Sequence, residues 1–155
     1  MQFKISKELL DQINSLILHN KERELHDLLS ELHYADIAEI MEELDDTQAS
    51  YIFSILDSEK TADVLMEIDE ELREKILKRM SAKEIAEEID ELDTDDAADI
   101  IAELPQSKKE EVISELEDVE HAKDIVDLLR YDEDTAGGLM GKELVKVNEN
   151  WNVLT

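Results

Sequence analysis

The hydrophobic positions of this chain repeat every twelve residues between His33 and Leu128. In each unit the eighth, ninth and twelfth places are mostly apolar, and these places lie on one face of an α-helix. The twelfth places are Leu44, Leu56, Ile68, Met80, Leu92, Leu104, Leu116 and Leu128. The pattern therefore predicts a series of short helices, each with one apolar stripe.

The first place of each unit carries residues that favour the start of a helix. These residues are His33, Asp45, Asp57, Asp69, Ser81, Asp93, Pro105 and Glu117. The pairs Ser81 with Glu84 and Ser107 with Glu110 have the spacing of a capping box. Pro105, the single proline, lies at a unit boundary, where one helix must stop and the next can begin.

Helices of about nine residues are only marginally stable alone, so they must share a core. Stacked in antiparallel pairs, they predict an all-α superhelical solenoid, armadillo- or HEAT-like in the broad sense. Two further helices are expected before the repeat, from Ser6 to about Leu18 and from Lys21 to Leu32. Ser6 is the expected N-cap of the first.

The pattern changes after residue 130, and all three glycines of the chain follow this change. We expect Gly137 and Gly138 to end the last helix or its extension, where glycine supplies backbone freedom. Gly141 would then free the approach to a short strand at Leu144–Val147. The predicted organisation is a helical domain over 1–130, a linker over 131–141 and the start of a second domain over 142–155.

The composition is strongly acidic and narrows the choice of partners. There are 43 acidic and 16 basic residues, and the net charge is −27. Such a surface repels the phosphates of nucleic acids and anionic lipids, and it attracts cations. The chain has no cysteine, no secretory signal and no long apolar run. We therefore expect a cytoplasmic segment that does not itself enter the membrane.

No sequence motif of a catalytic site is present, so we expect no enzymatic activity. His19, His26 and His33 recur every seven residues. On one continuous helix, neighbouring histidines would lie about 10 Å apart along the axis, too far to share a metal ion. We expect them to be exposed histidines or histidines at helix boundaries.

Among the many carboxylates, Asp95 and Asp99 have a spacing that brings them to one helix face. Asp63 holds the seventh place of its unit, as Asp99 does, and equivalent places point the same way if alternate units stack in parallel. Oxygen ligands without sulfur or nitrogen suit Mg²⁺ or Ca²⁺. Spacing alone leaves two interpretations open, a divalent-cation site or a solvated helix face.

Two stretches resemble a known family. They are ELDTDDAADIIAELP, from Glu91 to Pro105, and YDEDTAGGLM, from Tyr131 to Met140, with NENWNV further on. The chain is similar to the cytosolic N-terminal domain of MgtE-type magnesium transporters and channels. The resemblance implies that a cystathionine-β-synthase-type (CBS) domain and a membrane pore follow, that the whole protein is a homodimer, and that this domain lies at the cytoplasmic face of the cell membrane.

The resemblance also implies a regulatory role for Mg²⁺. Ions held between the N-terminal and CBS domains would favour a closed pore, and the ligands of this domain would be Asp63, Asp95 and Asp99. The remaining ligands would come from the CBS domain, so this chain would hold half a site. Gly137, Gly138 and Gly141 would form the joint between the domains. The alternative is a solenoid scaffold that binds other proteins through its acidic surface.

Overall fold

The computed structural model describes residues 5–131 and 135–143, and this part of the chain is helical. The predicted strand at 144–147 and the rest of the predicted second domain lie outside the described residues, apart from 142 and 143. The helices are α1 (Lys7–Leu18), α2 (Glu22–Ser30), α3 (Tyr34–Glu42), α4 (Asp46–Ile55), α5 (Ser58–Glu67), α6 (Glu70–Arg79), α7 (Ala82–Ile89), α8 (Thr94–Glu103), α9 (Gln106–Glu115) and α10 (Val119–Leu128). None of them is both long and apolar enough to cross a membrane.

The eight predicted units are the helices α3 to α10, so the prediction of an all-α solenoid is confirmed. The twelfth places of the third and of the fifth to eighth units are buried in a single continuous core, and those of the first, second and fourth units are partly buried against it. The two helices expected before the repeat are α1 and α2. Ser6 caps α1 as predicted, since its hydroxyl accepts a hydrogen bond from the backbone N–H of Leu9.

Most connections between repeat helices consist of two extended residues. Ile68 (φ −68°, ψ 153°) ends α5, and Asp69 (φ −62°, ψ 155°) begins α6. Ile68 buries its side chain, and Asp69 caps α6 by accepting a hydrogen bond from the backbone N–H of Leu72. Because this turn uses only negative φ, it needs no glycine, and this explains why the repeat contains none.

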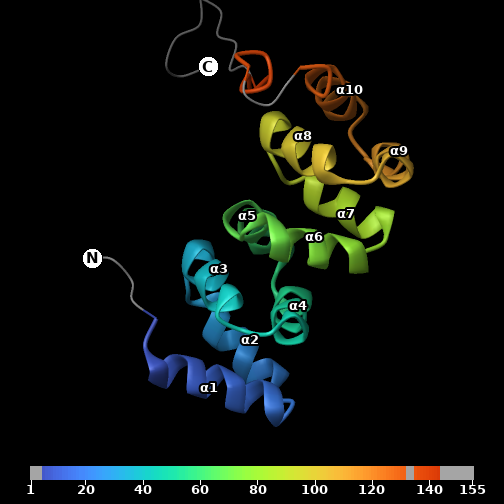
Figure 1. The fold of residues 1–155 in the computed structure, drawn as a ribbon. Coiled ribbons are helices and arrows are strands. Elements are labelled where there is room, and N and C mark those ends of the chain that lie inside the picture. Colours follow the sequence, from blue (N-terminus) through green and yellow to red (C-terminus); the bar gives the residue numbers. More distant parts are fainter. Residues whose placement is uncertain (1–4, 132–134, 144–155) are drawn as a thin grey trace, which may run out of the picture.

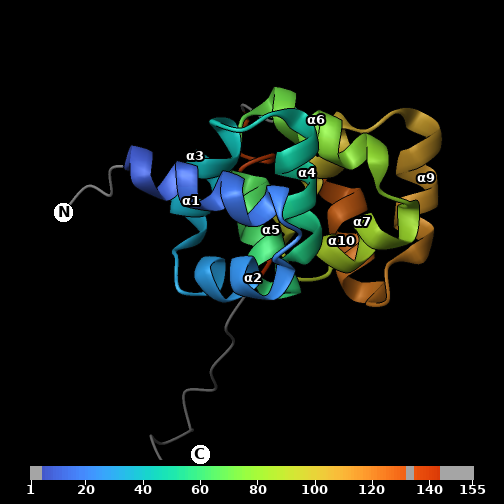
Figure 2. The ribbon, with the colours of Figure 1, turned by 90° about the horizontal axis from the view of Figure 1, so that it is seen from below.

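The helices wind upward in chain order, from α1 at one end to α10 at the other (Figure 1). The odd-numbered helices from α3 to α9 pack one against the next, whereas α4 packs with α6 and α8 with α10. Seen along the stack, α9 is displaced sideways from α1 and α3 (Figure 2). The array is therefore superhelical and not a straight stack.

The same interactions recur at positions forty-eight residues apart, so the repeat has two halves, α3–α6 and α7–α10. The ammonium group of Lys60 donates to the carbonyls of Leu29, Ser30 and Leu32 at the end of α2 and just after it. The ammonium group of Lys108 donates in the same way to the carbonyls of Leu77 and Met80 at the end of α6. In both cases a lysine satisfies carbonyls that a helix end leaves unpaired.

A second pair of contacts follows the same interval. A carboxylate oxygen of Glu42 accepts from the backbone N–H of Asp69, and one of Asp90 accepts from the N–H of Glu117. The contact between α5 and α7, which joins the halves, is less extensive than α3 with α5 or α7 with α9. The four-helix half is thus the larger structural unit, and a looser seam joins the two.

One predicted capping box is confirmed and the other is wrong. Ser81 and Glu84 exchange both hydrogen bonds of the box at the start of α7. Ser107 lies inside α9, which begins at Gln106 directly after Pro105. Proline fixes φ at a value suited to a helix start, so the helix begins before the serine. The second box of the described structure is formed by Asp45 and Gln48 at α4.

Candidate functional site

The candidate site lies at the first turns of α8. Asp95 and Asp99 are both half-buried and one helical turn apart, as predicted. Between the N-cap Asp93 and Asp95 lies Thr94, which is only 2% exposed. The side chain of Asp93 makes no capping hydrogen bond, so the start of α8 depends on a residue from elsewhere.

That residue is Glu143, which comes from the segment after the glycines. The backbone N–H of Thr94 donates to Oε1 of Glu143 (N···O 2.8 Å). In return, the backbone N–H of Lys142 donates to Oγ1 of Thr94 (3.0 Å). Burial opposes ionisation of Glu143, but the hydrogen bonds from Thr94 and from its own backbone outweigh it and lower the pKa of this carboxyl group.

Lys142 connects the same segment to α10. Its ammonium group forms an ion pair with Asp127 and lies 3.6 Å from Oδ1 of Asp124. The hydrogen bond between Lys142 and Asp127 raises the pKa of Lys142 and lowers the pKa of Asp127. The chain therefore returns from the end of α10 and is held against both α8 and α10.

The start of α8 gathers negative charge. Burial raises the pKa of Asp96, and the carboxylates of Asp95, Asp93 and Glu143 raise it further. A group whose pKa rises in this way is repelled by its neighbours, so the cluster would gain from a bound cation. Lys142 directs its ammonium group to α10.

An open groove of about 670 Å³ runs beside this cluster, between the segment 140–143 and the start of α10. Its walls carry four carboxylates, one histidine and one lysine. The lining residues are Thr94, Asp118, Glu120, His121, Asp124, Met140, Gly141, Lys142 and Glu143. The groove gives solvent and ions access to the linker side of the site.

Asp63 lies apart from the other two predicted ligands. It is exposed on α5, which belongs to the odd-numbered row, whereas Asp95 and Asp99 lie on α8 in the even-numbered one. Parallel stacking of alternate units therefore does not relate these positions. Within residues 5–131 and 135–143, no three acidic or histidine side chains come close enough together to hold a metal ion.

The glycines do not end a helix, so that prediction is wrong. Helix α10 ends at Leu128, and Gly137 and Gly138 lie in a separate turn, in which the N–H of Leu139 donates to the carbonyl of Thr135. No described glycine has a positive φ. Gly137 is needed for close packing instead, since a Cβ there would lie 2.4 Å from the ring of Tyr131.

Two of the three histidines, His19 and His33, lie exposed at helix boundaries as expected, but His26 does not. His19 hydrogen-bonds the carbonyl of Ser15, and His33 caps α3 by accepting from the N–H of Ala35. The ring of His26 lies 3.3 Å from a carboxylate oxygen of Asp57. Because His26 is partly buried within α2 and contacts a residue 31 positions away, the expectation is wrong for this histidine.

The roles of Thr94, Lys142 and Glu143 were not predicted from the sequence. A weak signal was present, because Lys142 is the single basic residue between Arg130 and Lys146. A lone lysine after an acidic run is expected to find a carboxylate partner. Its partners on α10 and the capping role of Glu143 depend on the tertiary fold, which spacing along the chain does not reveal.

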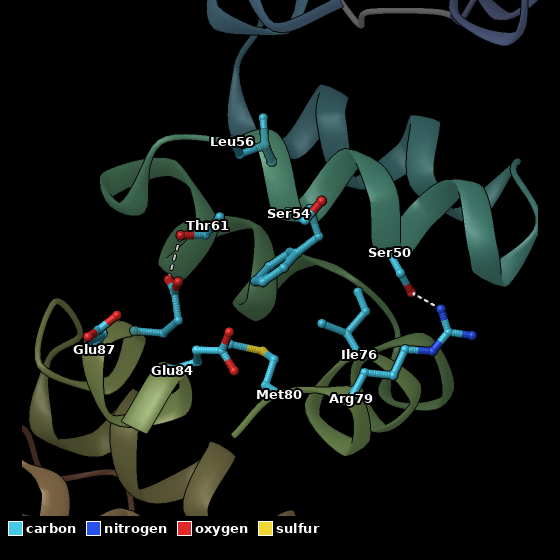
Figure 3. Close-up of a pocket in the computed structure, with 11 residues that line it drawn as sticks. Ser50, Ser54, Leu56, Thr61, Ile76, Arg79, Met80, Glu84 and Glu87 are labelled. Atoms are coloured by element: carbon cyan, nitrogen blue, oxygen red, sulfur yellow. Dashed lines mark hydrogen bonds between the residues drawn. The ribbon is translucent and has the colours of Figure 1, made fainter. Parts of the chain in front are cut away.

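A second hollow, of about 420 Å³, lies at the seam between the two halves (Figure 3). It is walled by Phe53, Ile76 and Met80, with Arg79 on one side and acidic residues of α7 on the other. The hydroxyl of Thr61 donates to Glu88, and burial raises the pKa of that carboxyl group. None of the three predicted ion ligands lines this hollow, so it is separate from the start of α8.

Comparison with known proteins gives a consistent result. The comparison with curated proteins found no match. A solved structure described as the soluble part of a magnesium transporter is 26% identical, with a TM-score of 0.76. Another, described as the cytosolic domain of the Mg²⁺ channel MgtE in complex with ATP, is 27% identical, with a TM-score of 0.79. Both alignments cover 90% of this chain, which spans 55% and 57% of the length of those chains.

The family model described as the MgtE intracellular N domain matches residues 32–134. This range contains all eight repeat helices and the three aspartates predicted as ligands. The match covers well over half of the chain, and the chain therefore belongs to the family of MgtE intracellular N domains.

Proposed function

We propose that this chain is the regulatory domain of a magnesium transporter and senses intracellular Mg²⁺ through the carboxylates of α8. The observation that supports this most is the pair Asp95 and Asp99, one turn apart in a chain of net charge −27 that belongs to the MgtE family. No catalytic step is assigned to the domain.

The donors available at α8 fit Mg²⁺ in part. Mg²⁺ prefers oxygen ligands, keeps several water molecules and is commonly held by one or two carboxylates. Asp95 and Asp99 can supply these two, and both are accessible. The remaining positions would be filled by water or by an acidic surface of a following CBS domain, with Asp63 contributing at the same interface.

The proposed mechanism rests on charge repulsion. Two acidic surfaces repel one another when cations are scarce, and this repulsion favours an open arrangement of the domains. A divalent ion that bridges carboxylates binds the closed arrangement more tightly than the open one, and only such differential binding shifts the equilibrium. In a homodimer, both copies would respond in this way and close the pore.

A melting experiment on this chain tests the proposal against the scaffold alternative. Mg²⁺ is compared with Na⁺ at matched ionic strength, because general screening stabilises an acidic protein in both salts. A binding site adds a saturable increase in melting temperature with Mg²⁺ alone. A scaffold with a merely solvated acidic face would show equal shifts in the two salts.

The matched control lies on α9. Asp95→Asn with Asp99→Asn should remove the additional Mg²⁺ shift, whereas Glu111→Gln with Glu115→Gln should retain it. The second pair is also one turn apart and removes the same charge, although its side chains are exposed and those of the aspartates are half-buried. Loss of the shift in both double variants, or in neither, would contradict the assignment to α8.

A further inference from the structure

Residues 141–143 are attached to the helical domain at two points. One is the start of α8, through Thr94, and the other is α10, through Asp124 and Asp127. We call this three-residue segment, Gly141 to Glu143, the linker clasp. Its contacts join positions up to 49 residues apart in sequence, so they belong to the tertiary fold and not to a local turn.

At α8 the clasp supplies the capping hydrogen bond that Asp93 does not make. The N–H of Thr94 is one of the donors that the first turn of a helix leaves unpaired, and Thr94 is buried. Asp93 does not satisfy this donor, but Glu143 does. A carboxylate at this position also interacts favourably with the positive end of the helix.

At α10 the clasp is held by charge. The side chain of Lys142 is 17% exposed, so it is largely covered where it meets Asp127 and Asp124. Its ammonium group is placed between two carboxylates of one helix face. Lys83, by contrast, pairs with Glu87 while its side chain is 72% exposed, which makes it a suitable comparison.

The clasp also touches the proposed ion site. A Cβ atom at Gly141 would lie 3.2 Å from a carboxylate oxygen of Glu143 and 3.6 Å from one of Asp95. The backbone of Gly141 is therefore in contact range of both carboxylates. A Cβ at this position would meet Asp95 at an ordinary contact distance, so the approach to Asp95 does not itself require glycine.

We propose that Lys142 and Glu143 are positioning residues, which fix the segment 141–143 on α8 and α10 so that it moves with Asp95 as one body. Gly141 is then part of the helical domain and not a joint. The link between the clasp and ion binding rests on the proposed function, whereas the clasp itself does not.

Ion binding and the clasp should strengthen one another. A cation at Asp95 reduces the repulsion between Asp95 and Glu143, and so favours the closed clasp. Since coupling between two events is reciprocal, opening the clasp must weaken cation binding by the same factor. Lys142 lies on the far side of the segment, so its removal tests this coupling without altering a proposed ligand.

Amide hydrogen exchange in this chain, without Mg²⁺, tests the clasp. The amides of Thr94 and Lys142 should be protected, and Lys142→Met and Glu143→Ala should each increase exchange at Thr94 by about tenfold or more. Lys83→Met should leave it unchanged. Free exchange at Thr94 in the wild type, or unchanged protection in both clasp variants, would overturn the proposal.

A Mg²⁺ titration of the same proteins tests the coupling. Lys142→Met should raise the Mg²⁺ concentration needed for half of the melting shift by about twofold or more, and Lys83→Met should not. Equal midpoints in wild type and Lys142→Met would overturn the coupling. If the wild type shows no Mg²⁺ shift, the proposed function fails, but the exchange experiment still decides whether the clasp exists.

Discussion

Helices α4 and α8 occupy equivalent places in the two halves of the repeat, yet they begin differently. Asp45 caps α4 with its own side chain, which accepts from the N–H groups of Thr47 and Gln48, and Gln48 completes the box. At α8 the equivalent Asp93 makes no such bond, and the cap comes from Glu143.

The residues that follow the two caps differ in the same sense. The places of Thr47 and Gln48 on α4 are held by Asp95 and Asp96 on α8. In the first turn of α4, the residues after Asp46 are neutral, and the helix start is capped by hydrogen bonds within that turn. The first turn of α8 is acidic, and its cap comes from Glu143 in a distant segment. The two halves share their core, and the proposed ion site lies where one half departs from the other.

The shared core predicts equal and large effects in the two halves. Ile52 and Ile100 hold the same place and are 0% and 1% exposed. Ile52→Ala and Ile100→Ala should each lower the free energy of unfolding by about 2–5 kcal/mol, measured by urea denaturation. A small effect in one half alone would show that the halves are not equivalent.

The next largest loss of stability is expected for the lysines whose ammonium groups donate to carbonyls at helix ends. Lys60→Met and Lys108→Met should each lower the free energy of unfolding by about 1–3 kcal/mol, because carbonyls at helix ends, most of them partly buried, lose their partner. Lys78→Met removes an exposed ion pair with Glu74 and should change it by about 0.5 kcal/mol or less. Equal losses at Lys60 and Lys78 would refute the role assigned to the repeated lysine.

The two caps should respond unequally. Asp45→Ala should lower the free energy of unfolding by about 0.5–2 kcal/mol, as expected for loss of an N-cap. Asp93→Ala should change it by about 0.5 kcal/mol or less, since its side chain caps nothing. Chemical denaturation of both variants measures the difference, and a larger loss at Asp93 would contradict the capping role of Glu143.

The smallest expected effect concerns Asp96 and depends on pH. Burial and neighbouring carboxylates raise its pKa, so the folded state binds its proton more tightly than the unfolded state. Its charged form therefore costs stability at neutral pH, and this cost disappears as the pH falls through the folded pKa. Asp96→Asn should stabilise the chain slightly at neutral pH and lose that advantage in acid. A variant less stable than wild type at neutral pH would oppose this account.

Much of the fold could be predicted from the sequence because each repeat helix is specified by residues within its own twelve-residue unit. The apolar places and first-place residues predicted all eight repeat helices, and Ser81 and Glu84 form the expected box. The mistaken box at Ser107 arose because Pro105 starts its helix two residues earlier. The local pattern therefore gave a correct prediction at Ser81 and a wrong one at Ser107.

The site was predictable only in part. The spacing of Asp95 and Asp99 predicts a shared helix face, and α8 provides it. The relation of Asp63 to that face, the contact of Gly137 with Tyr131 and the cap from Glu143 depend on how distant segments meet. Glycine was expected to end a helix because that is its commonest role, but here close packing requires it.

The most direct test of the central claim is Mg²⁺ inhibition of transport by the full-length transporter to which we propose that this chain belongs. Asp95→Asn with Asp99→Asn should raise the Mg²⁺ concentration for half-inhibition by about fivefold or more. Transport by the matched variant Glu111→Gln with Glu115→Gln should be half-inhibited at the same Mg²⁺ concentration as transport by the wild type. An unchanged midpoint in the Asp95 and Asp99 variant would contradict the claim that α8 senses Mg²⁺.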